Sequence, residues 1–233
     1  HPDRERMRAG DRAAAALGLP KSRFVFYKTI HSMCLDTVRP KPAILDTQDY
    51  REIASISGGL AIRGNYSFRP IAEDGVTFGS GPGDFVLSII TLARSHMIPL
   101  EELLSDDHTL RDLELRNVGP RAVLNFNEAL EAYKREHRKV DFSDMLELGR
   151  QAAPLPVSRA FIDEAQDLTN LQWLAVDNLL RDAETVYIGG DDDQAIYDFS
   201  GGNSEVFRAM GTRPGTIKLE HSHRCPRKVF EVA

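Results

Sequence analysis

The chain has 233 residues, enough for one large domain or two modest ones, because a chain of this length buries roughly 70% of its unfolded surface. Its 29 basic and 35 acidic residues give a formal net charge of −6, which excludes a generally basic coat for nucleic acid but not a local basic track. Residues 1–28 are net basic, whereas residues 160–205 are strongly acidic. The acidic part favours binding of a divalent cation, and the basic part favours contact with phosphate groups.

Two observations concern the compartment of the protein. The two cysteines, Cys34 and Cys225, lack the spacing of metal ligands, so they are expected to be reduced thiols. No signal peptide and no long apolar run is present. We therefore expect a cytoplasmic protein without a membrane span.

The first third of the chain begins with helix-forming composition over residues 3–17, followed by an apolar run at 24–27 that is typical of a strand. This strand leads into Thr29-Ile30-His31-Ser32, where Thr29 or Ser32 can cap a helix. From the residues alone, a structural role for His31 is the simpler interpretation.

The middle of the chain, from about residue 40 to 140, has mainly helical patterns. Asp46 starts a helix that runs to Ile56, and further helices are expected over 84–95, 100–104 and 120–137. The Gly- and Pro-rich stretch 60–83 predicts a hairpin or an irregular excursion.

The last third is expected to alternate strands and helices. Helices are predicted over 142–149, 168–180 and 203–210, and another begins at 226. Trp173 is predicted to lie in the core, where the helix over 168–180 covers a sheet.

The central stretch is FIDEAQD at 161–167, an apolar run that ends on two adjacent acids. Such a run predicts a buried parallel strand, and open α/β sheets bind ligands beyond the carboxyl ends of their strands. Asp163 and Glu164 would then lie at a ligand edge, where one carboxylate can hold a cation and the other can take a proton from water. A solvated acidic turn is the alternative interpretation.

Two later runs strengthen the first interpretation. The strand predicted over 184–190 leads into three aspartates and Gln194, and the strand predicted over 216–219 leads into His223 and Arg224. Acids, an amide and a guanidinium at one sheet edge are what phosphoryl transfer needs, because its transition state requires positioning and charge neutralisation.

These residues also carry a family resemblance. FIDEAQD resembles the Walker B motif of the UvrD/Rep-like superfamily 1 DNA helicases, GDDDQAIYDFSGG at 190–202 the following coupling motif, and LEHSHRCP at 219–226 the next arginine-bearing motif. TIHS at 29–32 and DFSDML at 141–146 resemble two upstream motifs of the same family. Five motifs in family order make the resemblance specific, although residues 40–120 match only loosely.

The resemblance implies an α/β fold with a RecA-like parallel sheet flanked by helices. Residues 1–38 and 141–233 would form part of motor domain 1A, and residues 39–140 would form an inserted, mainly helical subdomain 1B. ATP and Mg²⁺ are the implied cofactors.

The resemblance also implies roles for the nucleotide side. Asp163 would help to hold Mg²⁺, Glu164 would orient and deprotonate the attacking water, and Gln194 would sense the γ-phosphate. Arg224 would stabilise the charge on the transferring phosphate. His223 stands where the family has a Tyr that stacks on adenine.

On the DNA side, the resemblance implies contacts from Thr29 and His31, and stacking of bases on Tyr197 and Phe199. Phe199 stands at the position of a family Trp, and Ile30 stands where the family usually has Phe. Burial of both aromatic residues under the sheet is the alternative.

No GxxxxGK[ST] loop occurs in the sequence, so the chain is expected to be an internal fragment of a longer helicase. The implied activity of that protein is ATP-driven translocation on single-stranded DNA, 3′-to-5′, with unwinding at junctions between single and double strands; the fragment alone is expected to be inactive. Two alternatives remain open: a non-catalytic module that binds single-stranded DNA, and a metal nuclease built on Asp163, Glu164 and residues 191–193.

Overall fold

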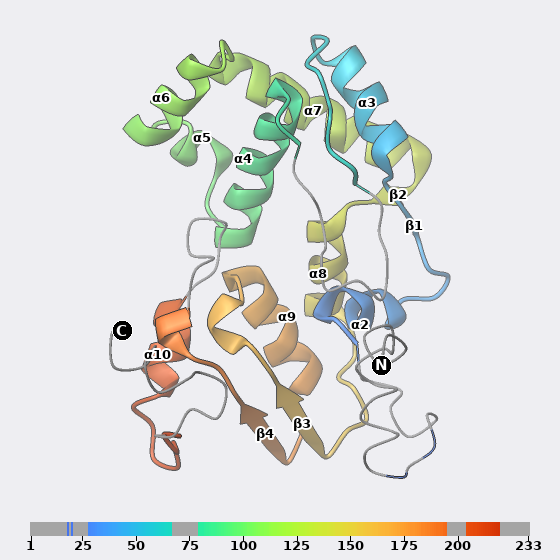
Figure 1. Cartoon of the computed structure of the whole chain (residues 1–233). Coiled ribbons are helices and arrows are strands. Elements are labelled where there is room, and N and C mark those ends of the chain that lie inside the picture. Colours follow the sequence, from blue (N-terminus) through green and yellow to red (C-terminus); the bar gives the residue numbers. More distant parts are fainter. Residues whose placement is uncertain (1–17, 19, 21–27, 67–78, 195–203, 220–233) are drawn as a thin grey trace, which may run out of the picture.

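The computed structural model describes residues 18, 20, 28–66, 79–194 and 204–219. Their elements form two groups, which occupy the upper and lower halves of Figure 1. We call helices α3 to α7 the helical group, and α2, α8, α9 and α10 with strands β3 and β4 the sheet group. Within the described ranges, no helix is both long and apolar enough to cross a membrane.

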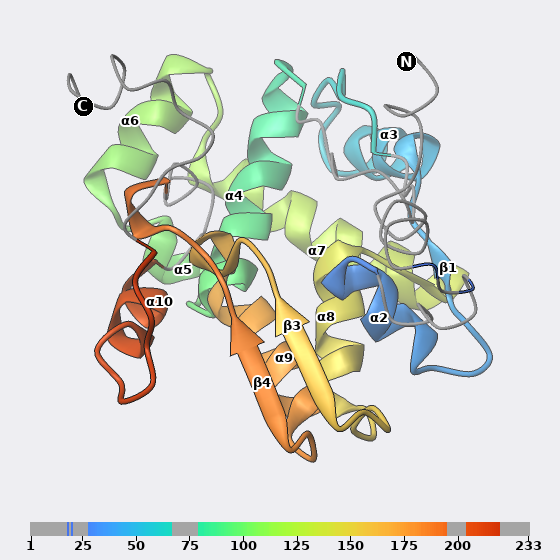
Figure 2. The same cartoon turned by 60° about the horizontal axis from the view of Figure 1, so that its bottom comes forward.

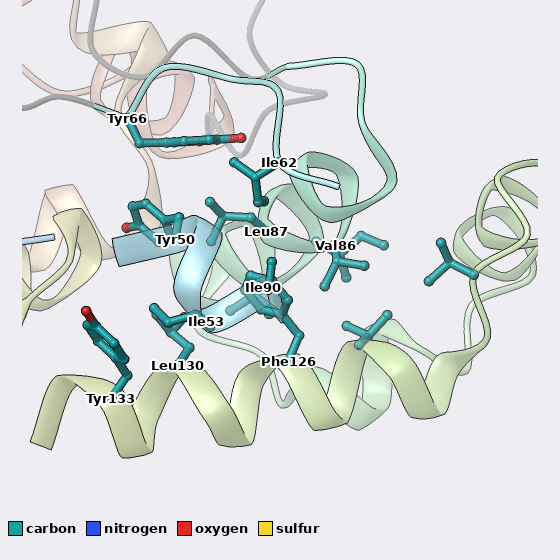
Figure 3. Packing of buried hydrophobic residues seen from close by; sticks show 14 of the residues in the cluster. Tyr50, Ile53, Ile62, Tyr66, Val86, Leu87, Ile90, Phe126, Leu130 and Tyr133 are labelled. Atoms are coloured by element: carbon teal, nitrogen blue, oxygen red, sulfur yellow. The ribbon is translucent and has the colours of Figure 1, made fainter. Parts of the chain in front are cut away.

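The helical group is built around one apolar core. Its elements are α3 (Thr47–Ile56), α4 (Pro82–His96), α5 (Leu100–Leu103), α6 (Asp107–Leu115) and α7 (Pro120–His137). Val123, Phe126 and Leu130 form a buried stripe along α7, at the spacing of one helical face. This stripe packs against Ile53 of α3 and Ile90 of α4, as Figure 3 shows for the labelled side chains. Each such side chain stabilises the fold by about 1.5–3 kcal/mol through burial alone.

A short parallel strand pair lies where the chain enters and leaves the helical group. Strand β1 (Ala43–Ile44) precedes α3, strand β2 (Lys139–Val140) follows α7, and Ile44 is in register with Val140. The two ends of the segment between them are therefore held side by side. No local pattern predicts this pair, because each strand has only two residues.

The sheet group contains α2 (Ile30–Asp36), α8 (Phe142–Gln151), β3 (Arg159–Ile162), α9 (Asn170–Leu180), β4 (Thr185–Ile188) and α10 (Ser204–Met210). Strands β3 and β4 pair in parallel, which confirms the predicted direction of the strands. Helix α9 lies behind this pair in Figure 2. Trp173 of α9 is 9% exposed and packs with Ala165 and Leu168, so its predicted place in the core is confirmed.

Two expectations about the strands are wrong. Strand β3 is not buried on both faces: Phe161 is 78% exposed and stacks on Tyr187 of β4, with ring centroids 4.7 Å apart. The run Thr216–Leu219 is not a strand in the described part of the chain, and Leu219 is 91% exposed. An apolar run becomes a strand only where a neighbouring strand pairs with it, and this run has no such partner among the described residues.

Most helix predictions are confirmed to within a few residues. The helices predicted over 84–95, 100–104, 120–137, 142–149, 168–180 and 203–210 correspond to α4, α5, α7, α8, α9 and α10. Helix α6 was not predicted. The helices expected over 3–17 and from 226 onward, and the strand expected over 24–27, lie outside the described residues.

Candidate functional site

The carboxyl ends of β3 and β4 stop together at one edge of the sheet. Ile162 and Ile188 are in register as the last residues of the two strands. Beyond them, the backbone N–H of Gly189 donates to the carbonyl of Ile162 at 2.8 Å, and the N–H of Ala165 donates to the carbonyl of Gly189 at 3.0 Å. The loops that follow the two strands are thus fixed to each other at their bases.

Asp163 and Glu164 begin the first of these loops, and both are exposed. Asp163 Oδ1 accepts a hydrogen bond of 3.1 Å from the backbone N–H of Glu164. Glu164 adopts a left-handed conformation, with φ of 52°, which costs a non-glycine residue about 1–2 kcal/mol. Such strain persists only where the surrounding structure imposes it, and it is commonest at functional sites.

The second loop carries Asp191 and Gln194. A short 3₁₀ turn, η3 (Asp192–Gln194), follows Asp191, and the N–H of Gln194 donates to the Asp191 carbonyl at 3.0 Å. The Asp191 carboxylate accepts from the N–H of Asp193 at 3.1 Å and from the side-chain amide of Gln194. Gln194 is therefore held close to Asp191, on the same edge as Asp163 and Glu164.

The two loops are joined by Gln166, which sequence reasoning missed. Its side chain is 1% exposed and lies in the 3₁₀ turn η2 (Ala165–Asp167). The amide Nε2 donates to Glu164 Oε2 at 2.9 Å, and Oε1 accepts from the N–H of Asp191 at 3.1 Å. Its burial could have been suspected only from its position two residues after the pair of acids, since its second partner is 25 residues away.

Oxygen ligands for a cation are present at this edge. Among the described residues, no group of three or more His, Cys, Asp or Glu side chains is arranged to hold a metal ion. Mg²⁺ commonly takes only one or two protein carboxylates and completes its shell with water and substrate phosphate. The exposed carboxylate of Asp163 can serve as one such protein ligand.

Comparison with known proteins now adds to this geometry. Residues 4–214 match the family described as the UvrD/REP helicase N-terminal domain. The chain belongs to the UvrD/Rep helicase family. The match covers far more than half of the sequence, so the family resemblance inferred from the motifs is confirmed.

Sequence identity to individual proteins of the UvrD/Rep type is modest. The chain is 29% identical over 143 residues to DNA helicase II of Salmonella typhimurium, a match that covers 54% of this chain and 20% of the relative. It is 28% identical over 143 residues to DNA helicase II of Escherichia coli, with the same coverage of 54% and 20%. It is 27% identical over 184 residues to the putative ATP-dependent DNA helicase YjcD of Bacillus subtilis, which covers 73% of this chain and 23% of the relative. The chain thus spans about a fifth of the length of the curated relatives it matches.

Of the four residues that the UvrD/Rep resemblance predicts to contact DNA, the structure describes only Thr29 and His31, at the start of α2. Thr29 caps the helix, and its Oγ1 accepts from the N–H of Ser32 at 3.4 Å. His31 is partly buried and meets the ring of Phe142 edge-on, with centroids 5.8 Å apart. Burial lowers the pKa of His31 to about 4, so the imidazole is neutral at pH 7. His31 can therefore offer hydrogen bonds and ring contacts, but not a positive charge.

Between these two residues, Ile30 connects α2 to the acidic loop. It packs against the cluster of Ala165, Leu168 and Trp173, and Ala165 is the residue that comes directly after Glu164. Four further predicted site residues, Tyr197, Phe199, His223 and Arg224, lie outside the described residues. The structure thus brings together Asp163, Glu164 and Gln194, while DNA contacts at Thr29 and His31 stay predictions.

Proposed function

We propose that this chain is part of the first motor domain of an ATP-dependent DNA helicase, and that the edge formed by Asp163, Glu164 and Gln194 belongs to its ATP-hydrolysis site. The observation that carries the proposal is the convergence of these residues on one sheet edge, where a buried amide joins their two loops. Family membership supports the same reading, because the relatives are named as DNA helicases.

The proposed domain division places residues 1–38 and 141–233 in a RecA-like motor domain and residues 39–140 in a helical insertion. Two observations support it. The helical group has an apolar core of its own, and β1 pairs with β2 at the boundaries of the insertion. A segment whose two ends lie side by side can be inserted into a domain without separating the parts that flank it.

Each residue at the edge has a proposed task. Mg²⁺ would supply charge neutralisation on the phosphates of ATP, with the Asp163 carboxylate as a ligand. The Glu164 carboxylate would accept a proton from the attacking water, and Gln194 would hydrogen-bond the terminal phosphate. Arg224 would donate to the phosphate oxygens, and His223 would stack on the base, completing the set inferred from the sequence.

The proposed partner is single-stranded DNA and its junctions with duplex. Thr29 and His31 at the start of α2 would contact the strand, and Tyr197 and Phe199 would stack on its bases. Hydrolysis would drive 3′-to-5′ movement and unwinding, a polarity that rests on the family resemblance. Strand displacement from substrates with a 3′ or a 5′ single-stranded tail tests it directly.

The experiment that tests the proposal measures ATP hydrolysis by the product of the open reading frame that encodes this chain, with and without single-stranded DNA. We expect DNA-stimulated hydrolysis, and a fall of at least about 100-fold for Glu164→Gln, since general-base catalysis contributes roughly that much. Glu184→Gln is the matched control, because Glu184 is exposed and precedes β4 at the opposite end of the parallel pair. This control is expected to hydrolyse ATP at the unmodified rate.

Other outcomes decide against the proposal. Unchanged hydrolysis in Glu164→Gln would refute the assigned role. DNA binding without any hydrolysis would favour a non-catalytic binding module, and metal-dependent cutting of DNA without ATP would favour a nuclease.

A further inference from the structure

The side chain of Gln166 uses both ends of its amide in different loops. Nε2 donates to Glu164 Oε2 at 2.9 Å and to Asp167 Oδ2 at 3.3 Å. Oε1 accepts from the backbone N–H of Asp191 at 3.1 Å. Gln166 itself is 1% exposed, whereas its partners Glu164 and Asp191 lie at the surface. The amide is therefore a fixed connection between the loop after β3 and the loop after β4.

Only an amide of this length serves both contacts. A carboxylate at this position would accept from Asp191 but, when ionised, has no proton to donate to Glu164. A thioether of similar size offers no strong donor or acceptor, and Asn is one methylene shorter. The donor matters most, because a hydrogen bond to an ionised carboxylate is stronger and more directional than one between neutral groups.

The surrounding residues hold the amide in place. Gly190 lies directly against it: a Cβ at this position would collide with Gln166 Oε1 and come within 2.9 Å of the Phe207 ring of α10. The preceding residue, Ala165, is fully buried against Trp173 and Leu168. The amide oxygen is therefore confined on the side of Gly190, and the chain just before Gln166 is held in the apolar cluster.

We propose that Gln166 is a positioning residue for ATP hydrolysis: it aims the Glu164 carboxylate and ties its orientation to the loop that carries Asp191 and Gln194. The proposal rests on the function proposed above and deepens it. A shift of the second loop, where Gln194 lies, is transmitted through the Asp191 N–H and the amide to Glu164. The Glu164 carboxylate is then oriented to accept the proton only when the second loop places Gln194 at the terminal phosphate.

The test uses two substitutions in the product of the full open reading frame, with DNA-stimulated ATPase as the readout. Gln166→Met removes all three hydrogen bonds at nearly constant volume, and Gln166→Glu keeps the acceptor but faces Glu164 with a second carboxylate. Gln151→Met and Gln151→Glu are the matched controls, because Gln151 is exposed at the end of α8. Thermal unfolding of every variant is measured in parallel.

We expect kcat to fall by about 10- to 100-fold in Gln166→Met, with KM for ATP changed by less than about threefold, because misplacing a reacting group by 1 Å costs about that much. In Gln166→Glu, the acceptor for the Asp191 N–H is kept, but an ionised carboxylate has no proton to donate to Glu164, so kcat is expected to fall by a similar factor. A residue with only a structural role would lower the thermal stability without lowering kcat of the folded enzyme. Both Gln151 controls are expected to keep the rate and KM unchanged.

Two results would overturn the inference, and they differ from failure of the proposed function. If Glu164→Gln abolishes hydrolysis while both Gln166 variants behave like the Gln151 controls, the function stands and the positioning role is wrong. A lower thermal stability in both Gln166 variants, with kcat and KM for ATP unchanged below the unfolding transition, would reduce Gln166 to a structural residue. Normal hydrolysis in Glu164→Gln would overturn both proposals together.

Discussion

Arg94 of α4 donates to Asp141 at 2.7 Å, and Asp141 is the residue that caps α8. The same guanidinium reaches Asp144 at 2.5 Å, and Lys134 of α7 lies 2.9 Å from each of the two carboxylates. This cluster joins two helices of the helical group to the first turn of a helix in the sheet group. DFSDML, one of the motifs that carry the family resemblance, thus provides the acids that connect the two groups.

Removing the guanidinium tests the importance of this connection. Arg94→Met is expected to lower the free energy of unfolding by about 2–4 kcal/mol, because it leaves two acids of a largely buried cluster with Lys134 as their remaining cation. Chemical denaturation of the chain measures the change. Arg111→Met is the control, since Arg111 is exposed on α6. A change below about 0.5 kcal/mol in Arg94→Met would show that the connection is replaceable.

Asp84 gives a prediction about acid stability. It is fully buried and accepts from the Tyr66 hydroxyl at 2.6 Å and from the N–H groups of Arg63, Gly64 and Gly81 at 2.8–2.9 Å. Burial alone would raise the pKa of Asp84, but these hydrogen bonds outweigh it and hold the pKa below the ordinary value of 3.8. The folded state therefore binds this proton less readily than the unfolded state, and the stabilisation is lost as pH falls through the folded pKa.

Asp84→Asn is accordingly expected to cost about 2–3 kcal/mol near neutral pH, because an amide cannot accept from all four donors. The difference from the unmodified chain should shrink when unfolding is measured below the ordinary pKa of 3.8. Asp177→Asn, at an exposed position of α9, is the control. A difference that is the same at acidic and neutral pH would contradict the ionised state of Asp84.

An element could be predicted from the sequence when its own residues carry the signal, in the form of caps and a regular apolar stripe. Helix α7 was predicted to the residue, because Pro120 stands at its first position, basic residues fill its last turn and its apolar stripe is regular. Helix α6 does have a cap, Asp106, but it is only nine residues long and buries a single side chain, so the long buried stripe that made α7 predictable is absent from it.

For the site, the sequence predicted the acids and the sheet edge but not the connection between them. Asp163, Glu164 and Gln194 could be inferred because each follows an apolar run. The role of Gln166 depends on the distant N–H of Asp191, and the space for it depends on Gly190. Contacts of this kind are set by how β3 and β4 pair, which no local pattern records.

His31 gives a second pH-dependent prediction. Burial lowers the pKa of His31 from 6.5 to about 4, so between these values the unfolded chain binds a proton that the folded chain does not. Stability is then fully present above pH 6.5 and declines as pH falls towards 4. We expect a loss of about 1–2 kcal/mol between about pH 7 and about pH 5.

His31→Gln should remove most of this loss, and thermal or chemical unfolding at several pH values measures it. His108→Gln is the matched control, because His108 is exposed at the start of α6. The control is expected to keep the decline of the unmodified chain. A decline that survives in His31→Gln would assign the pH dependence to another group.

Two adjacent glycines at the sheet edge give the sharpest steric prediction. A Cβ on Gly190 would collide with Gln166 Oε1 and lie 2.9 Å from the Phe207 ring, whereas a Cβ on Gly189 would meet nothing closer than the Ile162 carbonyl at 3.7 Å. Gly190→Ala is therefore expected to lower the free energy of unfolding by about 1–3 kcal/mol, the usual cost of overpacking. Gly189→Ala should change it by less than about 0.5 kcal/mol, since neither glycine has a positive φ that would strain an alanine. Chemical denaturation of the two variants, side by side, compares substitutions that differ only in what the added methyl group meets. Equal effects of the two would mean that the loops after β3 and β4 do not approach as closely as the Gln166 connection requires.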